Sequence, residues 1–373
     1  MDSHAQTGWM WPQLSPELRL LTKCISASFI NLGMPDGRES YRFVDWELFV
    51  NLARRHRIEG LARNGLRVLT IDTPPDAMRE LSIAARGIAE QGLRTAAHSE
   101  QLRNAFTSEL IPLFFIKGLV VGTLAYGDPF MKNARDIDIL IPLEKLQNAI
   151  PVLRAMGHCP IHPAGSDEDI IRWHRISKES VWRSADGRLT VELHSALTDH
   201  AGLLAGMNVT NDCLHVEVTP GLSLPTLPKD EQFAYLCVHG ASSAWFRIKW
   251  IADLAGVISG ATESELARLV GTAKKLGAGR STRQALLLAC WLFPILRYDS
   301  HLAIEFRADR ISGWLARRSL SQMLGPEPSS RLFGTATIHL TQLVQTSRWK
   351  DGAGELVRQL SFPWRRRAFI FDE

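Results

Sequence analysis

The stretch Ala134-Arg135-Asp136-Ile137-Asp138-Ile139-Leu140-Ile141-Pro142 places two carboxylates inside an apolar run. Side chains two residues apart in a strand point to the same face, so we expect Asp136 and Asp138 to project together. The isoleucines between and after them then face the opposite way, into a core. Neighbouring carboxylates repel each other and are costly to desolvate. A divalent cation would remove that cost, and an all-oxygen ligand set favours a hard ion such as Mg²⁺.

The segment upstream predicts a short strand, a glycine turn and a helix. Residues 111–118 read Ile-Pro-Leu-Phe-Phe-Ile-Lys-Gly, a mostly apolar run that is typical of a buried strand. Residues 119–126 predict a short helix, and Gly-Asp-Pro at 127–129 predicts a turn. Lys117 and Gly118 therefore stand at a strand-to-helix turn, where glycine gives the backbone the freedom that a tight turn requires.

The segment downstream predicts a helix and then a hairpin. Residues 143–156 follow a helical pattern that contains a proline, and a glycine comes directly after them. Residues 177–184 and 188–196 predict two strands around an Asp-Gly turn. The second strand places Glu192 and His194 on one face and its apolar residues on the other. We infer a small mixed sheet that carries both aspartates and Glu192 on a common face.

The patterns on both sides of this sheet are helical, which predicts an α/β (α+β) fold with N-terminal and C-terminal helical segments around a small core. Residues 1–110 read as an N-terminal helical region that ends in one long helix from about residue 77. Residues 111–200 form the core, and residues 201–373 form a C-terminal helical domain.

The composition is that of an ordinary globular protein and argues against several classes. The 373 residues include 43 basic and 39 acidic side chains, and the formal charge of +4 is too small to favour a nucleic-acid partner. The longest apolar run, residues 285–296, is shorter than the about 20 residues that a membrane span requires. The N-terminus lacks the pattern of a signal peptide. With five scattered cysteines and no CxxC motif, we expect a cytoplasmic setting.

A strand ending in glycine, a short helix, a strand with Asp-x-Asp and a later strand with a third carboxylate form a specific combination. It resembles the nucleotidyltransferase superfamily that includes DNA polymerase beta and kanamycin nucleotidyltransferase. The resemblance is closer to a bacterial family of uncharacterised nucleotidyltransferases and spans about residues 80–300. The motifs that carry it are residues 116–118 with 124–129, residues 135–141, residues 191–194, and residues 236–240 with Trp245 and 249–254.

The resemblance implies nucleotidyl transfer, in which an acceptor attacks the α-phosphate of an NTP and pyrophosphate leaves. It assigns Asp136, Asp138 and Glu192 as the metal ligands and catalytic residues, with Mg²⁺ or Mn²⁺ as the cofactor. The acceptor would be a hydroxyl or phosphate of a small molecule, a peptide or a protein. Bacterial relatives of this kind are sometimes encoded beside peptide-modification genes, which makes a peptide one candidate.

The glycine turn holds the nucleotide phosphates in the superfamily. By that resemblance Lys117, Gly118 and Arg135 would contact phosphate, with Lys117 acting as a point charge. Many superfamily members have serine after the glycine, whereas this chain has Leu119. The departure leaves open a catalytically degenerate module of the same fold that binds a nucleotide or a partner. An antitoxin-like or antibiotic-modifying transferase would share the core as well.

Three further residues are candidates for the substrate pocket, and each has a second interpretation. His194 shares a face with Glu192 and either touches substrate or makes a hydrogen bond near the site. Tyr126 is either a core residue or a base-stacking platform. His239 either lines the pocket or packs between helices, where a hydrogen bond to Asp253 would satisfy it.

Overall fold

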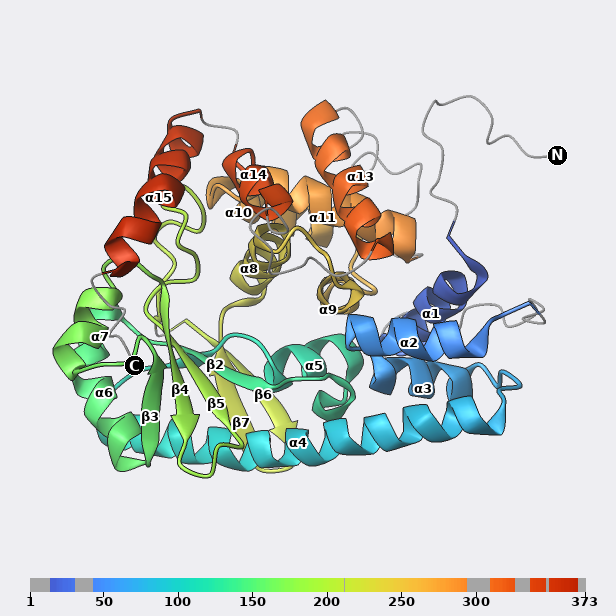
Figure 1. The fold of residues 1–373 in the computed structure, drawn as a ribbon, viewed down its shortest axis with the longest axis horizontal. Helices are drawn as coiled ribbons and strands as arrows, with labels where there is room; N and C mark the ends of the chain where they lie inside the picture. Colours follow the sequence, from blue (N-terminus) through green and yellow to red (C-terminus); the bar gives the residue numbers. More distant parts are fainter. Residues whose placement is uncertain are drawn as a thin grey trace.

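The structure is a computed structural model that describes residues 14–30, 43–210, 212–293, 309–325, 336–346 and 349–367. A five-stranded sheet and its covering helices occupy one side of the molecule, and helices make up most of the rest (Figure 1). The predicted mixed α/β fold, with helices before and after the sheet in sequence, is confirmed. None of the described helices is both long and apolar enough to cross a lipid bilayer.

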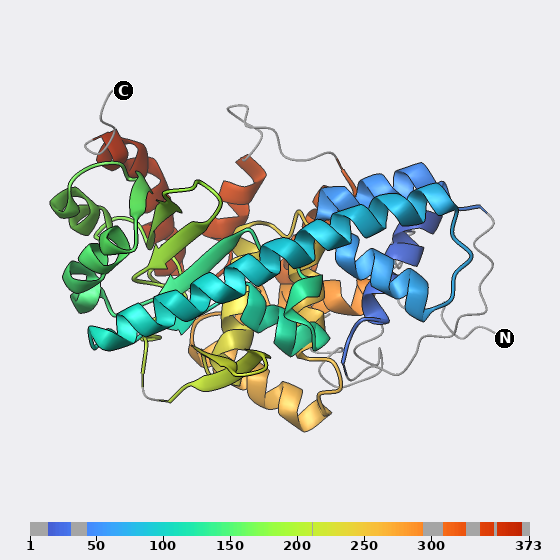
Figure 2. The same cartoon turned by 90° about the horizontal axis from the view of Figure 1, so that it is seen from below.

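The described N-terminal region is helical, as predicted. Its first helix begins at Pro16, where the Ser15 hydroxyl caps the helix by accepting a hydrogen bond from the Leu18 amide at 3.3 Å. Its last helix is continuous over 34 residues and passes under both the sheet and the N-terminal helices (Figure 2). The helices are α1 (Pro16–Ser26), α2 (Trp46–His56), α3 (Glu59–Val68) and α4 (Pro75–Ser108).

The main sheet has the strand order β1-β2-β5-β4-β3, in which β2 and β5 run parallel and the other neighbours run antiparallel. The predicted hairpin is β4–β5. The edge strand β1 pairs over two residues only, and the Ile116 amide donates one further hydrogen bond to the Asp138 carbonyl of β2 at 3.1 Å before the turn at Gly118. β3 was not predicted. The strands are β1 (Phe114–Phe115), β2 (Asp136–Leu140), β3 (His158–His162), β4 (Glu179–Ser184) and β5 (Thr190–His194).

Short helices connect these strands. The helix predicted over 143–156 begins as a 3-10 turn, becomes α-helical at Leu146 and continues through Pro151. Gly157 follows it with a φ of +80°, the left-handed conformation expected of a glycine after a helix. The connecting helices are α5 (Leu119–Tyr126), η1 (Pro129–Met131), η2 (Leu143–Lys145), α6 (Leu146–Ala155) and α7 (Asp167–Trp173).

A second, two-stranded sheet interrupts the C-terminal region that the sequence predicts to be helical. β6 (Leu214–Thr219) and β7 (Leu222–Thr226) pair antiparallel, and their side chains Val216, Val218 and Leu224 join the core of the main sheet. Helices follow, as predicted. They are α8 (Lys229–Ser242), α9 (Ile248–Val257), α10 (Glu263–Lys275), α11 (Gly279–Leu292), α13 (Arg310–Leu324), α14 (Ala336–Leu343) and α15 (Trp349–Arg367).

Strand β2 separates two hydrophobic cores. Ile137 and Ile139 pack with side chains of α4 and α6 in one core, whereas Leu140 belongs to the other core, which the helices build. The prediction that the isoleucines face away from the aspartates into a core is confirmed. The aspartate face is therefore turned toward the helical side of the molecule.

Helix α9 approaches α5 closely at Gly256. A Cβ atom on Gly256 would lie 2.7 Å from the Ala125 Cβ and 2.8 Å from the Ala125 carbonyl oxygen. Protein interiors are packed too densely to absorb such contacts without a shift of the backbone. The absence of a side chain at Gly256 thus sets how near α9 comes to the sheet and its aspartates.

We expect Gly256→Ala to lower the free energy of unfolding by about 1–3 kcal/mol, because the added methyl group pushes α5 and α9 apart. Urea unfolding followed by circular dichroism measures the change. Gly271→Ala in α10 is the matched control, since a Cβ atom there meets nothing within 4 Å. Alanine should stabilise that helix by about 0.5–1 kcal/mol. Equal stability of the Gly256→Ala and wild-type proteins would contradict the packing argument.

Candidate active site

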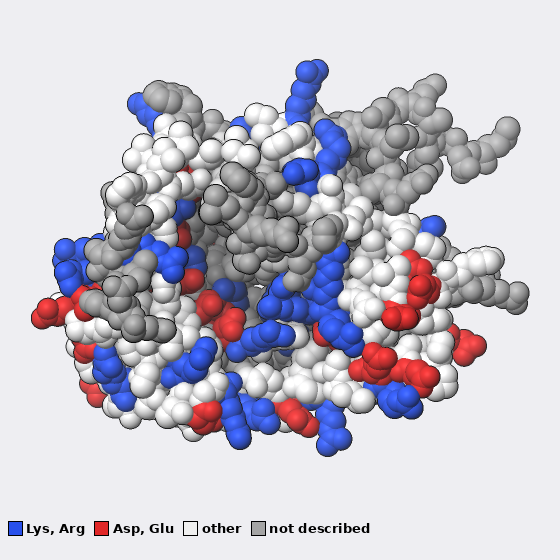
Figure 3. Space-filling model, in the orientation of Figure 1, with Lys and Arg blue, Asp and Glu red and all other residues white. Residues whose placement is uncertain are grey.

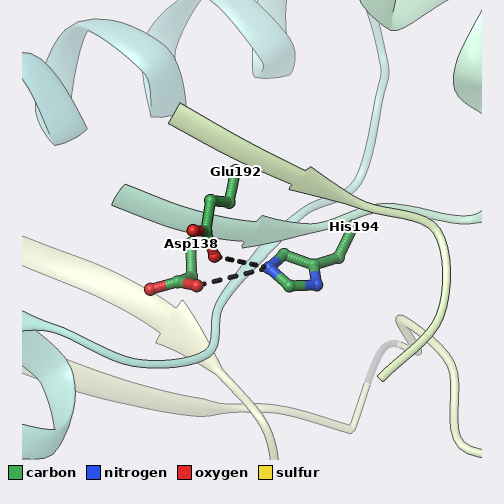
Figure 4. Close-up of side chains that lie close together, drawn as sticks. All are labelled: Asp138, Glu192 and His194. Atoms are coloured by element: carbon green, nitrogen blue, oxygen red, sulfur yellow. Dashed lines mark hydrogen bonds and ion pairs between the residues drawn. The ribbon is translucent and has the colours of Figure 1, made fainter. Parts of the chain in front are cut away.

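Two parallel strands bring the predicted carboxylates together. In the register of β2 and β5, Asp138 lies beside Glu192 and Asp136 lies beside Thr190. Residues at the same register of neighbouring strands point to one face, so both aspartates and Glu192 share a face, as predicted. Figure 4 shows the Asp138 and Glu192 carboxylates converging with the imidazole of His194.

Lys117 supplies a positive charge to this pair. Its Nζ forms an ion pair with Asp138 Oδ1 and lies 3.6 Å from Glu192 Oε2. The side chains of Asp138 and Lys117 are only 6% and 18% exposed, so water screens their attraction weakly. Burial alone would raise the pKa of Asp138, but Lys117 and His194 hold it well below the usual range. Burial alone would lower the pKa of Lys117, but Asp138 and Glu192 raise it well above its usual value.

His194 is fully buried behind the carboxylates. Its Nε2 lies 3.2 Å from Asp138 Oδ1 and 3.6 Å from Glu192 Oε2, and its Nδ1 lies 3.2 Å from Glu179 Oε2. Burial and the charge of Lys178 lower the pKa of His194, but the three carboxylates raise it above its ordinary value. The charged imidazolium is therefore favoured, and His194 acts as a second counter-charge for Asp138.

Asp136 is the carboxylate whose negative charge this network of positive groups stabilises least. Burial raises its pKa, and the negative charges of Glu192 and Asp138 raise it further. Burial and the two neighbouring carboxylates together disfavour the charged form of Asp136, and a cation bound nearby would favour it.

The donor set fits a hard divalent cation. Asp138 and Glu192 each offer a carboxylate oxygen, and His194 Nε2 lies with these atoms inside a group no more than 4.8 Å across, although only a neutral imidazole could bind the metal. Carboxylate oxygens are the ligands that Mg²⁺ prefers, and Asp136 adds another carboxylate on the same face. The Lys117 ammonium and the His194 imidazolium both contact Asp138 Oδ1, so a cation bound there would compete with them.

A cavity of about 370 Å³ adjoins the carboxylates. On the face drawn in Figure 3, basic side chains gather next to acidic ones around a hollow between the sheet and the helices. Such a mixture of charges suits a ligand that brings both phosphates and a metal ion. The basic lining residues are Arg57, Lys117, Lys132, Arg135, Lys178 and Lys249, and the acidic ones are Asp136, Asp138, Glu179, Glu192 and Asp253.

One wall of this cavity is built by α9 and the segment before β2. Lys132 forms an ion pair with Asp253, and the Tyr126 hydroxyl donates a hydrogen bond to the other Asp253 oxygen at 3.0 Å. Lys249 forms no ion pair within the described residues, and its Nζ lies 5.8 Å from the centre of the Trp250 ring. Burial, and then the charge of Lys132, lowers the pKa of Lys249 to about 7. Lys249 is thus a cation that an anionic ligand would stabilise.

The structure places the predicted phosphate-binding residues in different surroundings. Gly118 lines the cavity at the start of α5 with φ +63° and ψ −125°, a conformation that essentially only glycine adopts. Lys117 points to the carboxylates of the sheet. Arg135 is exposed at the cavity.

The predicted pocket residues also separate. His239 lines the cavity and stands edge-on to Trp250, with ring centres 6.0 Å apart. His194 and Tyr126 are buried and do not line the cavity. The alternative of a His239–Asp253 hydrogen bond is not realised, because Asp253 binds Tyr126 and Lys132 instead.

Sequence reasoning missed several charged residues of the site. Lys249 stood inside a quoted motif without a role, and Lys132 and Lys178 belong to no motif. Glu179 could have been found, because the predicted hairpin pairs it directly with His194 across β4 and β5. The others required knowledge of how α9 and the loops pack on the sheet.

The class of protein follows from comparison with known families, which points to nucleotidyltransferases. The sequence model of a family described as uncharacterised nucleotidyltransferase matches residues 43–294. This match covers more than half of the 373 residues, and the chain therefore belongs to that family. The matched part contains the sheet and α2 to α11, whereas α13 to α15 lie beyond it. No curated protein matches the chain.

We expect Lys117→Met to lower the free energy of unfolding by about 3–5 kcal/mol at neutral pH, because buried carboxylates lose their counter-charge. The native pKa of Asp138 lies below its unfolded value, so its stabilising contribution is present above the unfolded pKa. That contribution is lost as the pH falls through the native pKa. The difference between wild type and variant should therefore shrink below the ordinary aspartate pKa of about 3.9. Urea unfolding at a series of pH values measures it.

The matched control for this prediction is Lys229→Met. Lys229 forms an ion pair with Glu265 at 2.5 Å, but the two side chains are 46% and 30% exposed. Removing an exposed pair changes stability by at most about 1 kcal/mol. Equal losses in the two lysine variants would argue against a special role for Lys117.

Proposed function

We propose that this protein is a Mg²⁺- or Mn²⁺-dependent nucleotidyltransferase that moves a nucleoside monophosphate from an NTP to an acceptor. The acceptor group is a hydroxyl or phosphate of a small molecule, a peptide or a protein. The observation that carries the proposal is the side-by-side placement of Asp138 and Glu192 at a partly basic cavity, in a chain of a nucleotidyltransferase family. The proposal includes kinship with the superfamily of DNA polymerase beta.

The strand carboxylates would hold the metal. Asp136, Asp138 and Glu192 offer hard oxygen ligands on one face, and the raised pKa of Asp136 supports a need for added positive charge there. When bound, the metal ion would neutralise the triphosphate and polarise the α-phosphate. His194 would keep Asp138 in place from behind.

In the proposed reaction, the acceptor oxygen forms a bond to the α-phosphorus of the NTP. The bond from that phosphorus to the oxygen bridging to the β-phosphate breaks, and pyrophosphate leaves with the electron pair. The proton of an acceptor hydroxyl passes to a carboxylate. Glu192 is the candidate for this base, because it lines the cavity and its side chain is 22% exposed.

The basic wall would bind the phosphates. Lys249 would take the role that the sequence analysis assigned to Lys117, because Lys117 already neutralises Asp138. Gly118 would let phosphate approach the backbone at the start of α5, and Arg135 would add charge at the cavity. The chain thus contributes mainly position and charge, as phosphoryl-type transfers require.

One observation favours a second candidate function, a degenerate nucleotide-binding module. Lys117 contacts the Asp138 oxygen that would bind a metal ion. The ammonium group thus provides a fixed positive charge in place of the metal ion. A module of this kind would bind an NTP on the basic wall without turnover. Binding without transfer is the outcome that would identify it.

We expect Asp136→Asn and Asp138→Asn each to reduce nucleotidyl transfer at least 100-fold, since metal ligands contribute several kcal/mol to such transition states. The assay follows α-labelled NTP in a cell extract and identifies the labelled acceptor by mass. Asp186→Asn in the β4–β5 turn is the control, because this exposed carboxylate lies outside the cavity. Retained activity in both site variants would sink the mechanism.

The charge of Lys249 should make NTP binding depend on pH. Below its pKa of about 7 the side chain is a cation, and above it the charge is lost, so the NTP dissociation constant should rise as the pH increases through 7. Lys132, Arg57, Arg247 and Asp253 are charged groups that shift the pKa of Lys249, and Lys249 in turn lowers the pKa of Asp136. Equilibrium dialysis at several pH values measures the effect.

Two variants isolate this dependence from the ionisation of the nucleotide itself. Lys249→Met should weaken binding about tenfold at the acidic end, the loss expected for one charge-assisted hydrogen bond. Lys249→Arg should keep tight binding at all these pH values, because arginine remains charged. Identical pH profiles for wild type and Lys249→Met would remove Lys249 from the phosphate site.

A further inference from the structure

A second, smaller cavity adjoins the proposed nucleotide site. Its volume is about 150 Å³, and a protein cavity of about this size holds a six-membered ring. Lys178, His239 and Ser242 line both cavities, so the two spaces meet at these side chains. The outer wall of the small cavity comes from α14, α15 and the segment between them, which lie beyond the part of the chain matched by the family.

Two buried side chains of this cavity have hydrogen-bonding nitrogens without a partner. Gln345 is 1% exposed, and its Nε2 has no hydrogen-bond partner among the described residues. His200 is 6% exposed, and its Nδ1 accepts a hydrogen bond from the Gly202 amide at 3.1 Å. The proton of the neutral imidazole therefore lies on Nε2, which is buried and has no partner either. Unsatisfied buried donors are costly, so these two groups would stabilise a hydrogen-bond acceptor placed in the cavity.

The basic and acidic side chains that line the small cavity are equal in number. Arg358 donates hydrogen bonds to both oxygens of Glu355, at 2.6 and 2.7 Å. Lys178 forms an ion pair with Glu179, while its amide donates to Asp199 Oδ1 at 2.7 Å. With two basic and two acidic lining residues, this cavity offers no surplus charge to a phosphate-bearing molecule. It differs in this respect from the larger cavity, where Lys249 lacks an ion-pair partner among the described residues.

The remaining surface of the small cavity combines a hydrogen-bond acceptor with apolar contact. The Asp199 carboxylate can accept further hydrogen bonds, and Leu197 and Val238 provide buried apolar side chains. A polyhydroxyl ring matches this pattern, because each hydroxyl both donates and accepts while the CH groups pack against apolar atoms. A purely apolar molecule would leave these donors and the carboxylate unmatched, a small cation would leave the donors unmatched, and a small anion would face the Asp199 carboxylate.

We propose that the small cavity is the acceptor site and that it takes a neutral, hydroxyl-bearing molecule the size of one sugar ring. This inference rests on the proposed transferase function. A hydroxyl of the molecule would reach the larger cavity past Lys178, His239 and Ser242. Its oxygen would bond to the α-phosphorus, pyrophosphate would leave, and the hydroxyl proton would pass to a carboxylate of the strand face.

The test uses the full chain with Mg²⁺ and α-labelled ATP, GTP, CTP and UTP. Neutral monosaccharides and cyclic polyols are offered as acceptors, each next to its phosphorylated form, and a cell extract is offered in parallel. We expect label on a neutral polyhydroxyl compound in preference to its phosphate. Label found only on phosphorylated, nucleic-acid or protein acceptors would overturn the acceptor proposal and leave nucleotidyl transfer standing.

Variants then locate the acceptor. Gln345→Leu removes the Nε2 donor, and Asp199→Asn keeps an oxygen for the Lys178 amide but removes the charge. Each should raise the KM for the acceptor about tenfold, the effect of one lost hydrogen bond, with the NTP dissociation constant unchanged. Gln147→Leu on the exposed side of α6 lines neither cavity and is the control. An unchanged acceptor KM in both cavity variants would overturn the site assignment.

Nucleotide binding separates failure of this inference from failure of the transferase itself. Mg²⁺ with NTP should raise the melting temperature of wild type, Gln345→Leu and Asp199→Asn alike, because ligands that bind only the native state stabilise it. A shift without transfer to any compound, in the panel or the extract, would overturn both proposals and leave the degenerate binding module.

Discussion

The ion pair between Lys117 and the carboxylates of β2 and β5 is the interaction on which the site depends. Parallel pairing forces Asp138 and Glu192 into the same register, where neither can move away from the other without breaking the sheet. Lys117 reaches both because it lies two residues after β1, at the turn that precedes α5. That end is fixed in turn, since the buried Gln232 of α8 donates a hydrogen bond to the Ile116 carbonyl at 3.1 Å. Charge compensation thus links the sheet to the helical side of the molecule.

The same constraint explains why the cations divide into two groups. A lysine next to buried carboxylates is kept in its charged form by them. Its charge is already neutralised, so it attracts a phosphate only weakly. Lys249, which burial and Lys132 destabilise as a cation, gains most from an anionic ligand. The role of each lysine therefore depends on its position relative to the carboxylates. It does not follow from the residue type or from the sequence motif.

The features that the sequence predicted are those set by local periodicity. The alternation in β2 fixed which side chains face the core, and the Asp-Gly turn fixed the β4–β5 hairpin. The uninterrupted pattern from residue 77 gave α4. The features that escaped prediction depend on contacts between distant segments. β3 has a weak alternation and forms because β4 pairs with it, and the ion pair of Lys132 with Asp253 joins residues that are far apart in sequence. The small cavity is lined by four stretches that are far apart in sequence, namely residue 178, residues 197–200, residues 238–242 and residues 342–358.

Helix α4 has a consequence for how the molecule unfolds. At 1.5 Å per residue its 34 residues extend over about 50 Å. Ala77 and Leu81 near its start belong to the helical core, whereas Leu102 and Phe106 near its end belong to the core of the sheet. A domain boundary at residue 110 would assign all of α4 to the N-terminal region. The second half of α4, however, packs in the core of the sheet. If either core unfolds, one end of this shared helix loses its packing partners. The two cores should therefore unfold together in a single cooperative transition.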